Sequence, residues 1–239
     1  ELEPLIVDLI ARDAVHVPPY PGVALRLRQV VAGGEYGVAE LANVVSGDQV
    51  LVATVIRAAN SAAFRGSTQV ATLREALGRL GSDEVCRIAL AATLGRSASL
   101  DGSLATLRRM AWRQALTSAV VCRQLAALRR VDPEEAFICG LLHDFGRVVA
   151  VASIEDVLAA RPGEGARPQA EWMALVDRFH VEIGVLTAHR WQLAEVHTAA
   201  MAHHHAVDAA GPHRPLVGLV ALSDVVVGVV EETPYVLSR

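Results

Sequence analysis

The chain has 239 residues, a formal net charge of −4 and a sequence pI of about 6.1, and 52% of its residues are hydrophobic while only 4% are aromatic. This balance argues against a nucleic-acid-binding protein, because the net charge does not attract a polyanion. It also disfavours a β-sandwich or barrel, whose strands need more aromatic and β-branched residues. Cys86, Cys122 and Cys139 form no CxxC pair, so we expect free thiols and a cytoplasmic protein.

No secretory signal is visible at the N-terminus, and the longest apolar run near the C-terminus, 216–230, carries Asp224 in its middle. This run is too short to span a bilayer. We therefore expect it to be a buried helix and expect no contact with a membrane.

The first part of the chain shows a helical period in its apolar residues and no convincing strand. The expected helices cover residues 5–14, 23–31, 38–45, 49–60, 72–80 and 82–96. Gly81 is expected to end one helix with a positive φ, and Ser82 to cap the next.

Residues 97–103 are small, polar and without periodicity, which is typical of a joint between domains. We therefore predict an N-terminal helical lobe, 1–102, and a C-terminal helical bundle, 103–239. The second part should contain helices at 104–128, from Pro133 onward, and at 169–179, 182–190, 194–204 and 215–230. The predicted fold class is all-α.

His143 and Asp144 stand side by side inside an apolar run that extends from Phe137 to Val151. A buried carboxylate beside an imidazole needs a metal, a counter-charge or a hydrogen bond to offset its desolvation. Two interpretations stay open. The pair could ligate a divalent metal, or Asp144 could simply fix a ring N–H or cap a helix.

Several segments occur together in a recognisable order. They are Pro18-Pro19-Tyr20-Pro21, Asn60-Ser61-Ala62-Ala63-Phe64, Ala76-Leu77-Gly78-Arg79-Leu80-Gly81, Gly140-Leu141-Leu142-His143-Asp144-Phe145-Gly146, and Trp191-Gln192-Leu193 leading to His203-His204-His205. This combination resembles the HDOD domain, a bacterial signalling module related to the HD superfamily of metal-dependent phosphohydrolases. The resemblance covers most of the chain and implies an N-terminal helical lobe packed on an HD-like helical bundle.

The resemblance also implies a set of site residues. His143 and Asp144 match the adjacent pair of catalytic HD enzymes, and Asp224 matches their late aspartate. The further ligands of two-metal relatives correspond to His180, His204 and His205. The first metal-binding histidine of these enzymes is replaced here by Gln114, whose amide oxygen is a poor ligand for a transition metal.

Other residues allow both a structural and a functional interpretation. Consecutive residues on a helix point about 100° apart, so at most one or two of His203, His204 and His205 can face a common centre. Asp224 lies in an apolar run and needs a partner, which could be His143, a backbone amide or a metal. Asn60 and Ser61 should form a turn at a helix end, and together with Trp191 they are candidates for the contact between the lobes.

These observations predict a non-catalytic signal-transduction module with a degenerate HD site and no bound metal or other cofactor. It would dock onto a signalling protein such as a sensor kinase or a protein that handles cyclic dinucleotides. The alternative is a residual phosphohydrolase or phosphodiesterase that holds Mn, Fe or Mg through His143, Asp144, His180, His204 and Asp224. A third possibility is a pocket that binds a nucleotide without cleaving it.

Overall fold

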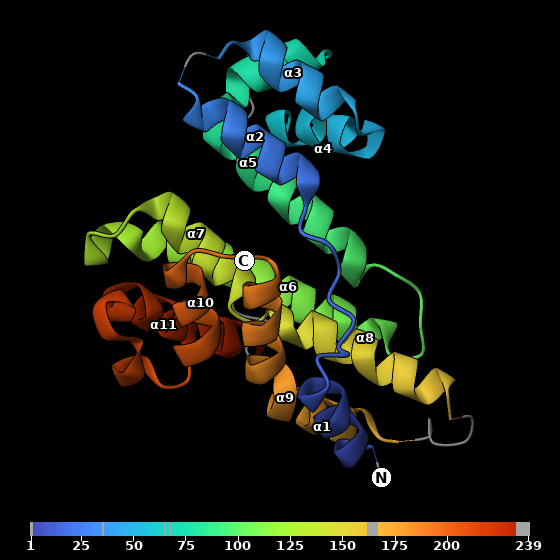
Figure 1. Ribbon diagram of the computed structural model, residues 1–239. Helices are drawn as coiled ribbons and strands as arrows, with labels where there is room; N and C mark the ends of the chain where they lie inside the picture. The colour runs from blue at the N-terminus through green and yellow to red at the C-terminus, as the bar shows by residue number, and fades with distance from the viewer. Residues whose placement is uncertain (1, 35, 65, 67, 162–166, 233–239) are drawn as a thin grey trace. The chain divides into compact units, whose positions relative to one another are not determined.

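A computed structural model describes residues 2–34, 36–64, 66, 68–161 and 167–232 (Figure 1). All regular structure in these residues is helical, which confirms the predicted fold class. The chain forms two compact units: one comprises residues 19–97, and the other comprises residues 1–18 and 98–239. The sequence placed residues 1–18 in the N-terminal lobe, whereas in the structure they belong to the unit that contains the C-terminal helices.

In the unit formed by residues 19–97, the described residues form four helices around an apolar core. They are α2 (Gly22–Ala32), α3 (Val38–Ser46), α4 (Gln49–Ala59) and α5 (Leu73–Ala98). Buried Leu27, Val45 and Val55 contribute to the core from three of the helices. Gly81 has a φ of 76° and interrupts α5, as predicted, because a residue with a side chain is strained in this conformation.

Asn60 follows α4 and connects it to the segment before α5. Its backbone has ordinary right-handed helical angles rather than a left-handed turn. The side-chain amide donates to the carbonyl of Val70 and its oxygen accepts from the Val70 N–H, both at 2.8 Å. Asn60 therefore satisfies both backbone groups of a buried residue.

We expect Asn60→Ala to lower the free energy of unfolding by about 2 kcal/mol, because both polar groups of Val70 lose their partners. Urea denaturation followed by circular dichroism measures this change. The matched control is Thr54→Ala, which removes an exposed hydroxyl that donates to the carbonyl of Val50 and accepts from the exposed guanidinium of Arg57, both on α4. Equal stability of the two variants would contradict the bridging role of Asn60.

The second unit contains α1 (Glu3–Ala11), α6 (Ala105–Arg129), α7 (Pro133–Leu142), α8 (Phe145–Ala159), α9 (Gln169–Arg190), α10 (Glu195–His203), the 3-10 helix η1 (Val207–His213) and α11 (Arg214–Glu232). Helix α7 packs on α6, α8 packs on α9, and α11 lies against α6. The predicted break between residues 179 and 182 is wrong, because α9 is continuous there. Phe179, His180 and Ile183 are all buried on its inner side.

Residues 13–18, which precede α2, are held against α9 by polar contacts to their backbone. The Arg190 guanidinium donates to the carbonyls of Asp13 and Val15. The indole N–H of Trp191 donates to the carbonyl of Pro18 at 2.7 Å. These contacts account for the position of residues 1–18 within the C-terminal unit.

Among the residues that the structure describes, two stretches are long and apolar enough to cross a bilayer by length and composition alone. The window at Pro133–Ala159 is 83% buried, which is typical of core helices, whereas the window at Val207–Val229 is only 33% buried. The expectation that the run 216–230 is simply a buried helix therefore holds for one side of α11 only.

Candidate functional site: an imidazole and carboxylate cluster

The central feature of the site is a two-residue break between α7 and α8, occupied by His143 and Asp144. Asp132 caps the start of α7 by accepting hydrogen bonds from the backbone N–H groups of Glu134 and Glu135. Both residues of the break are buried: the side chain of His143 is 1% exposed and that of Asp144 is 11% exposed.

Two glycines fix the break against the neighbouring helices. A Cβ atom on Gly140 would lie 2.9 Å from the Ala119 Cα, so α7 approaches the backbone of α6 closely at this point. A Cβ atom on Gly146 would lie 2.0 Å from the His180 carbonyl oxygen, so α8 approaches α9 even more closely. The two glycines of the Gly-Leu-Leu-His-Asp-Phe-Gly segment thus hold the His-Asp pair between α6 and α9.

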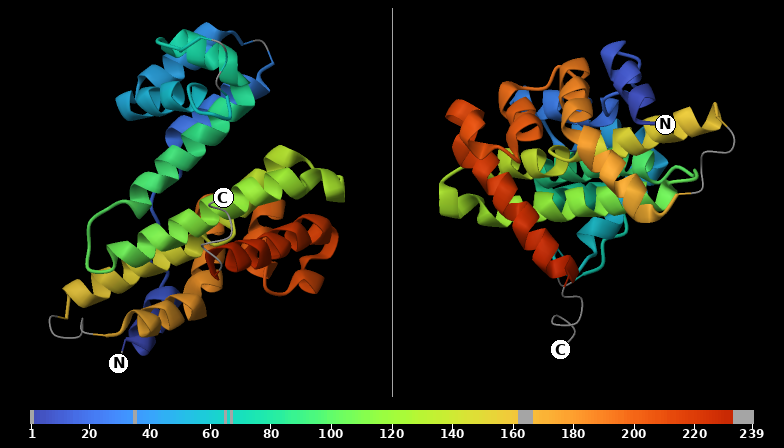
Figure 2. Two further views of the ribbon diagram at one scale, coloured as in Figure 1. Left: turned by 180° about the vertical axis from the view of Figure 1, so that it is seen from behind. Right: turned by 90° about the horizontal axis from the view of Figure 1, so that it is seen from below.

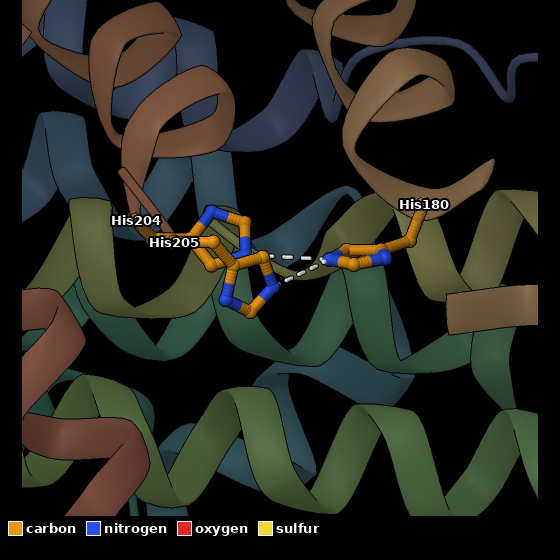
Figure 3. Close-up of side chains that lie close together, drawn as sticks. All are labelled: His180, His204 and His205. Carbon is orange, nitrogen blue, oxygen red and sulfur yellow. Dashed lines mark hydrogen bonds between the residues drawn. The ribbon is translucent and has the colours of Figure 1, made fainter. Parts of the chain in front are cut away.

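Three imidazoles converge beside this pair (Figure 3). His180 comes from α9, while His204 and His205 follow α10, and their ligand nitrogens all lie within 4.8 Å of one another. The His180 Nε2 atom is 3.3 Å from the His204 Nε2 atom and 3.1 Å from the His205 Nε2 atom. His203 and His197 are not part of this group, which was found among the described residues.

The orientation of the rings is set by backbone carbonyls. The Nδ1 atom of His143 lies 2.9 Å from the Gly140 carbonyl oxygen. The Nδ1 atom of His180 lies 2.6 Å from the Asp177 carbonyl oxygen, and that of His204 lies 3.1 Å from the Ala200 carbonyl oxygen. Because a carbonyl oxygen can only accept, each Nδ1 carries the proton, and each Nε2 is directed toward the centre of the cluster. A backbone partner of this kind is typical of histidines that bind metals.

The protonation of His180 agrees with this orientation. Burial lowers the pKa of His180 to about 4, although the charge of Asp144 opposes the shift. His180 is therefore neutral at pH 7, with a lone pair on Nε2. Two such lone pairs at about 3 Å repel each other unless a proton or a cation lies between them.

Asp144 has a different environment at each carboxylate oxygen. Oδ1 lies 3.4 Å from the His204 Nε2 and 3.5 Å from the His180 Nε2, and it is buried without a hydrogen bond. Oδ2 accepts a 2.8 Å hydrogen bond from the Arg147 guanidinium, which also pairs with Asp177. Although burial raises the pKa of Asp144, the charges of His143 and Arg147, together with the nearby His204 side chain, outweigh it and hold this pKa well below its ordinary value.

His143 and Asp224 form the second half of the cluster. The His143 Nε2 atom lies 3.0 Å from Asp224 Oδ1 and 3.6 Å from Asp144 Oδ2, without well-aligned hydrogen-bond geometry to either. Burial lowers the pKa of His143, but the two carboxylates outweigh this effect and raise the pKa to about 9. The Ser118 hydroxyl, on α6, donates to Asp224 Oδ1 at 3.3 Å.

Gln114 lies on α6, one turn before Ser118, and lines a small pocket together with Arg147 and Asp177. The volume of this pocket is about 30 Å³, and its other walls come mainly from apolar residues such as Met110 and Val176. Gln114 therefore lies near Arg147, the residue whose guanidinium binds Oδ2 of Asp144.

The structure brings six of the seven predicted site residues together: His143, Asp144, His180, His204, His205 and Asp224. Sequence reasoning missed Arg147 and Ser118. The signal for Arg147 was its position three residues after Asp144, which allows the two side chains to meet on the first turn of α8.

The other predicted contact residues lie within their own units. Asn60 bonds to Val70, as described above, and the Trp191 ring packs at 5.1 Å, centroid to centroid, from Phe145. The Ser61 N–H donates to the carbonyl of Ala58. A role for these three residues in contact between the lobes stays a prediction.

The donor set fits one cation. The Nε2 atoms of His180, His204 and His205 and the unsatisfied Oδ1 of Asp144 are ligands that Mn, Fe and Zn accept. A second ion bridged by Asp144 does not fit, because Arg147 already occupies Oδ2 and places a positive charge there.

The chain matches the HDOD domain over residues 17–207 and belongs to this family. It is 25% identical to an uncharacterised protein of Treponema pallidum (strain Nichols) over 92% of this chain, but it spans only 44% of the length of that relative. The chain therefore corresponds to less than half of this longer protein.

Three solved structures share the fold. An HDOD domain protein of unknown function from Geobacter sulfurreducens has a TM-score of 0.70 and 24% identity, with 91% of this chain and 76% of that chain covered. A Shewanella amazonensis SB2B protein provisionally described as a metal-dependent phosphohydrolase has a TM-score of 0.75 and 19% identity, with coverages of 95% and 82%. A Marinobacter aquaeolei VT8 protein provisionally assigned to signal transduction has a TM-score of 0.62 and 22% identity, with coverages of 89% and 49%.

Proposed function

We propose that this chain is a cytoplasmic regulatory module that does not hydrolyse phosphate esters and that acts by docking onto a signalling protein. The observation that carries the proposal is the Arg147 guanidinium on Asp144. The family resemblance, which assigns Gln114 to the position of the first HD histidine, supports it. A sensor kinase or a protein that handles cyclic dinucleotides is the class of partner we expect. The description of the Marinobacter aquaeolei relative supports a role in signalling.

Metal-dependent hydrolysis of a phosphate ester requires a metal that both activates a water molecule and stabilises charge on the phosphoryl oxygens. Here one oxygen of the central carboxylate is bound by a cation that belongs to the protein itself. Gln114 contributes an amide instead of an imidazole, which weakens binding of a transition metal on that side. Both features oppose the assembly of a reactive centre.

The pocket that Gln114 and Arg147 line also offers little room for a substrate next to Gln114. Small-molecule pockets usually have volumes of roughly 300–1,000 Å³. The pocket at Gln114 and Arg147 offers about 30 Å³, room for about one water molecule. A larger hollow of about 660 Å³ is lined by Arg108, Glu155 and Arg161 among others, and it shares no residue with the imidazole cluster.

A residual phosphohydrolase is the second candidate, and the convergence of the imidazoles favours it. His180, His204 and His205 could hold a single Mn, Fe or Mg ion, with Asp144 as a further ligand. The Shewanella amazonensis relative is described as an enzyme of this class. Bound metal alone does not distinguish the two candidates, but turnover does.

We expect no turnover of mononucleotides, cyclic nucleotides or cyclic dinucleotides when Mn, Fe or Mg is supplied. The measurement is product formation followed by chromatography, alongside metal content by plasma mass spectrometry. Wild type is compared with His143→Ala and with Gln114→His, which restores the first imidazole. Turnover by the wild type that disappears in His143→Ala would overturn the proposal.

A thermal-shift screen tests the third possibility, a nucleotide bound without cleavage. Ligands that bind only the folded state raise the melting temperature. We expect no shift with nucleotides, because the pocket that Gln114 and Arg147 line is too small for one. A shift that His143→Ala removes would replace protein docking with ligand binding as the function of this site.

A further inference from the structure

The charged residues of α6 are all positive. Residues 102–131, which include the whole of α6, contain six arginines and no acidic residue, although the chain as a whole has a net charge of −4. Arg108 is buried and pairs with Glu155 on α8. Arg109 is exposed, and its guanidinium donates to the neutral hydroxyl of Thr106. No carboxylate on α6 itself therefore offsets the charge of its exposed arginines.

One exposed stripe runs along α6. Its members are spaced alternately by four and three residues, so they follow one line along the helix. They are Arg109, Arg113, Leu116, Val120, Arg123 and Ala127. All of them are exposed except Arg123, which is partly buried. In the left view of Figure 2, α6, in green, lies on the near side of its unit, and we call this line of residues the α6 stripe.

The α6 stripe is apolar at its centre and basic on both sides of the centre. Leu116 and Val120 are 37% and 43% exposed, where a surface helix usually presents polar residues. Two arginines precede this pair and Arg123 follows it. Arg113 and Arg123 also interact with other groups of the chain. A surface that complements the α6 stripe must therefore be apolar at its centre and acidic toward both ends.

This pattern argues against two other occupants. A second copy of α6 would place arginines opposite arginines in a parallel pair, and an antiparallel pair centred on Leu116 and Val120 would place Arg113 opposite Arg123. A membrane would take up only the central apolar pair, because the wide apolar face of α6 is already packed on α7 and α11. A helix with leucines flanked by carboxylates matches the α6 stripe in both polarity and charge.

We propose that the α6 stripe is a docking surface for an acidic amphipathic helix of a partner protein, with apolar side chains at its centre and Asp or Glu residues toward both ends. This inference rests on the proposed function, because it names the surface by which the module docks and the chemistry of its partner. The α6 stripe is about 27 Å long and one helix wide, so the contact is smaller than the roughly 800 Å² per partner of stable interfaces. The expected complex is therefore transient.

Fluorescence anisotropy with the whole chain tests the proposal. The probe is a designed, dye-labelled helical peptide with leucines at the centre of one face and glutamates toward both ends of that face. The matched probe has the same composition and charge, but its leucines and glutamates are distributed evenly around the helix. The wild type should bind the first peptide at least about tenfold more tightly than the second. Its affinity should decrease as the salt concentration rises, because salt screens exposed charges.

Two substitutions on the α6 stripe should weaken binding of the first peptide. Arg109→Glu should weaken it about tenfold, because repulsion replaces attraction, and Val120→Glu on the order of a hundredfold, because its charge would be desolvated against the leucines. The matched control is Arg129→Glu, which makes the same change of charge as Arg109→Glu on the same helix. Arg129 follows Val120 by nine residues and therefore projects about 180° away from it. This variant should bind like the wild type, and circular dichroism checks that all three variants are folded.

Equal binding of the two peptides by the wild type would overturn the proposal, and so would equal losses in Arg109→Glu and Arg129→Glu. Binding to vesicles of phosphatidylcholine and phosphatidylglycerol without binding of the peptide would assign the α6 stripe to a membrane and also overturn it. The turnover measurement tests the regulatory function separately. A wild type that shows neither turnover nor peptide binding would overturn this docking surface and leave the proposed regulatory function in place.

Discussion

Substitution of Gly146 by alanine is expected to destabilise the C-terminal unit by about 3 kcal/mol or more. The added Cβ would lie 2.0 Å from the His180 carbonyl oxygen and 2.8 Å from the Gly184 backbone nitrogen, so α8 and α9 would have to separate. Helix propensity alone predicts the opposite sign, because alanine favours a helix over glycine by about 1 kcal/mol. A measured loss of stability would therefore show that the contact between α8 and α9 outweighs helix propensity at this position.

Gly184→Ala is the matched control, because Gly184 lies at the same contact on α9. Its added Cβ would be 3.5 Å from the Met201 Cε atom and 3.8 Å from the Gly146 Cα atom, both ordinary contacts. Urea denaturation followed by circular dichroism should show Gly184→Ala within about 1 kcal/mol of the wild type. If Gly146→Ala were as stable as this control, the close packing of α8 on α9 at the site would be contradicted.

The sequence predicted the features of the fold that depend on residues close together along the chain. Apolar periodicity and helix-end residues such as Asp132 and Gly81 depend on neighbouring residues along the chain, so most helices were predicted close to their observed bounds. The break expected between residues 179 and 182 was wrong. Nothing local shows that Phe179, His180 and Ile183 share one buried face of α9.

The site was predictable to the extent that the family resemblance supplied it. His143, Asp144 and Asp224 came from the motif, and the structure places them within contact distance. Arg147 and Ser118 were missed because an arginine or a serine on a helix is usually exposed, and the spacing of Arg147 from Asp144 permits their contact without requiring it. Their roles depend on which carboxylate lies opposite, and only the packing of α6 and α8 determines that.

Asp144→Asn should have an effect of similar size, a loss of about 3–5 kcal/mol in metal-free protein near pH 6. The variant leaves the buried His143 imidazolium and the Arg147 guanidinium without their shared counter-charge. The pKa of His143, raised to about 9 by the two carboxylates against the effect of burial, should fall substantially. NMR titration of the His143 ring protons measures this pKa, and urea denaturation measures the stability.

The pH dependence follows from the direction of each shift. The pKa of His143 is raised from 6.5 to about 9, so its stabilising contribution is complete below about pH 6.5 and is lost as the pH rises toward 9. The pKa of Asp144 is lowered from 3.8, so its contribution is present above about pH 3.8 and is lost at lower pH. The difference between wild type and Asp144→Asn should therefore be largest between these limits, at about pH 4–6.5.

Asp177→Asn provides the control, because Asp177 pairs with the same guanidinium but its side chain is 48% exposed. An exposed ion pair contributes at most about 1 kcal/mol, so this variant should remain close to the wild type at every pH. Equal effects of the two substitutions would mean that Arg147 is stabilised equally by both carboxylates and that the buried Asp144 has no special role. A large effect confined to Asp144→Asn, with a lowered His143 pKa, would show that Asp144 holds two cationic side chains of the protein itself, which is the electrostatic reason to expect no hydrolytic metal centre here.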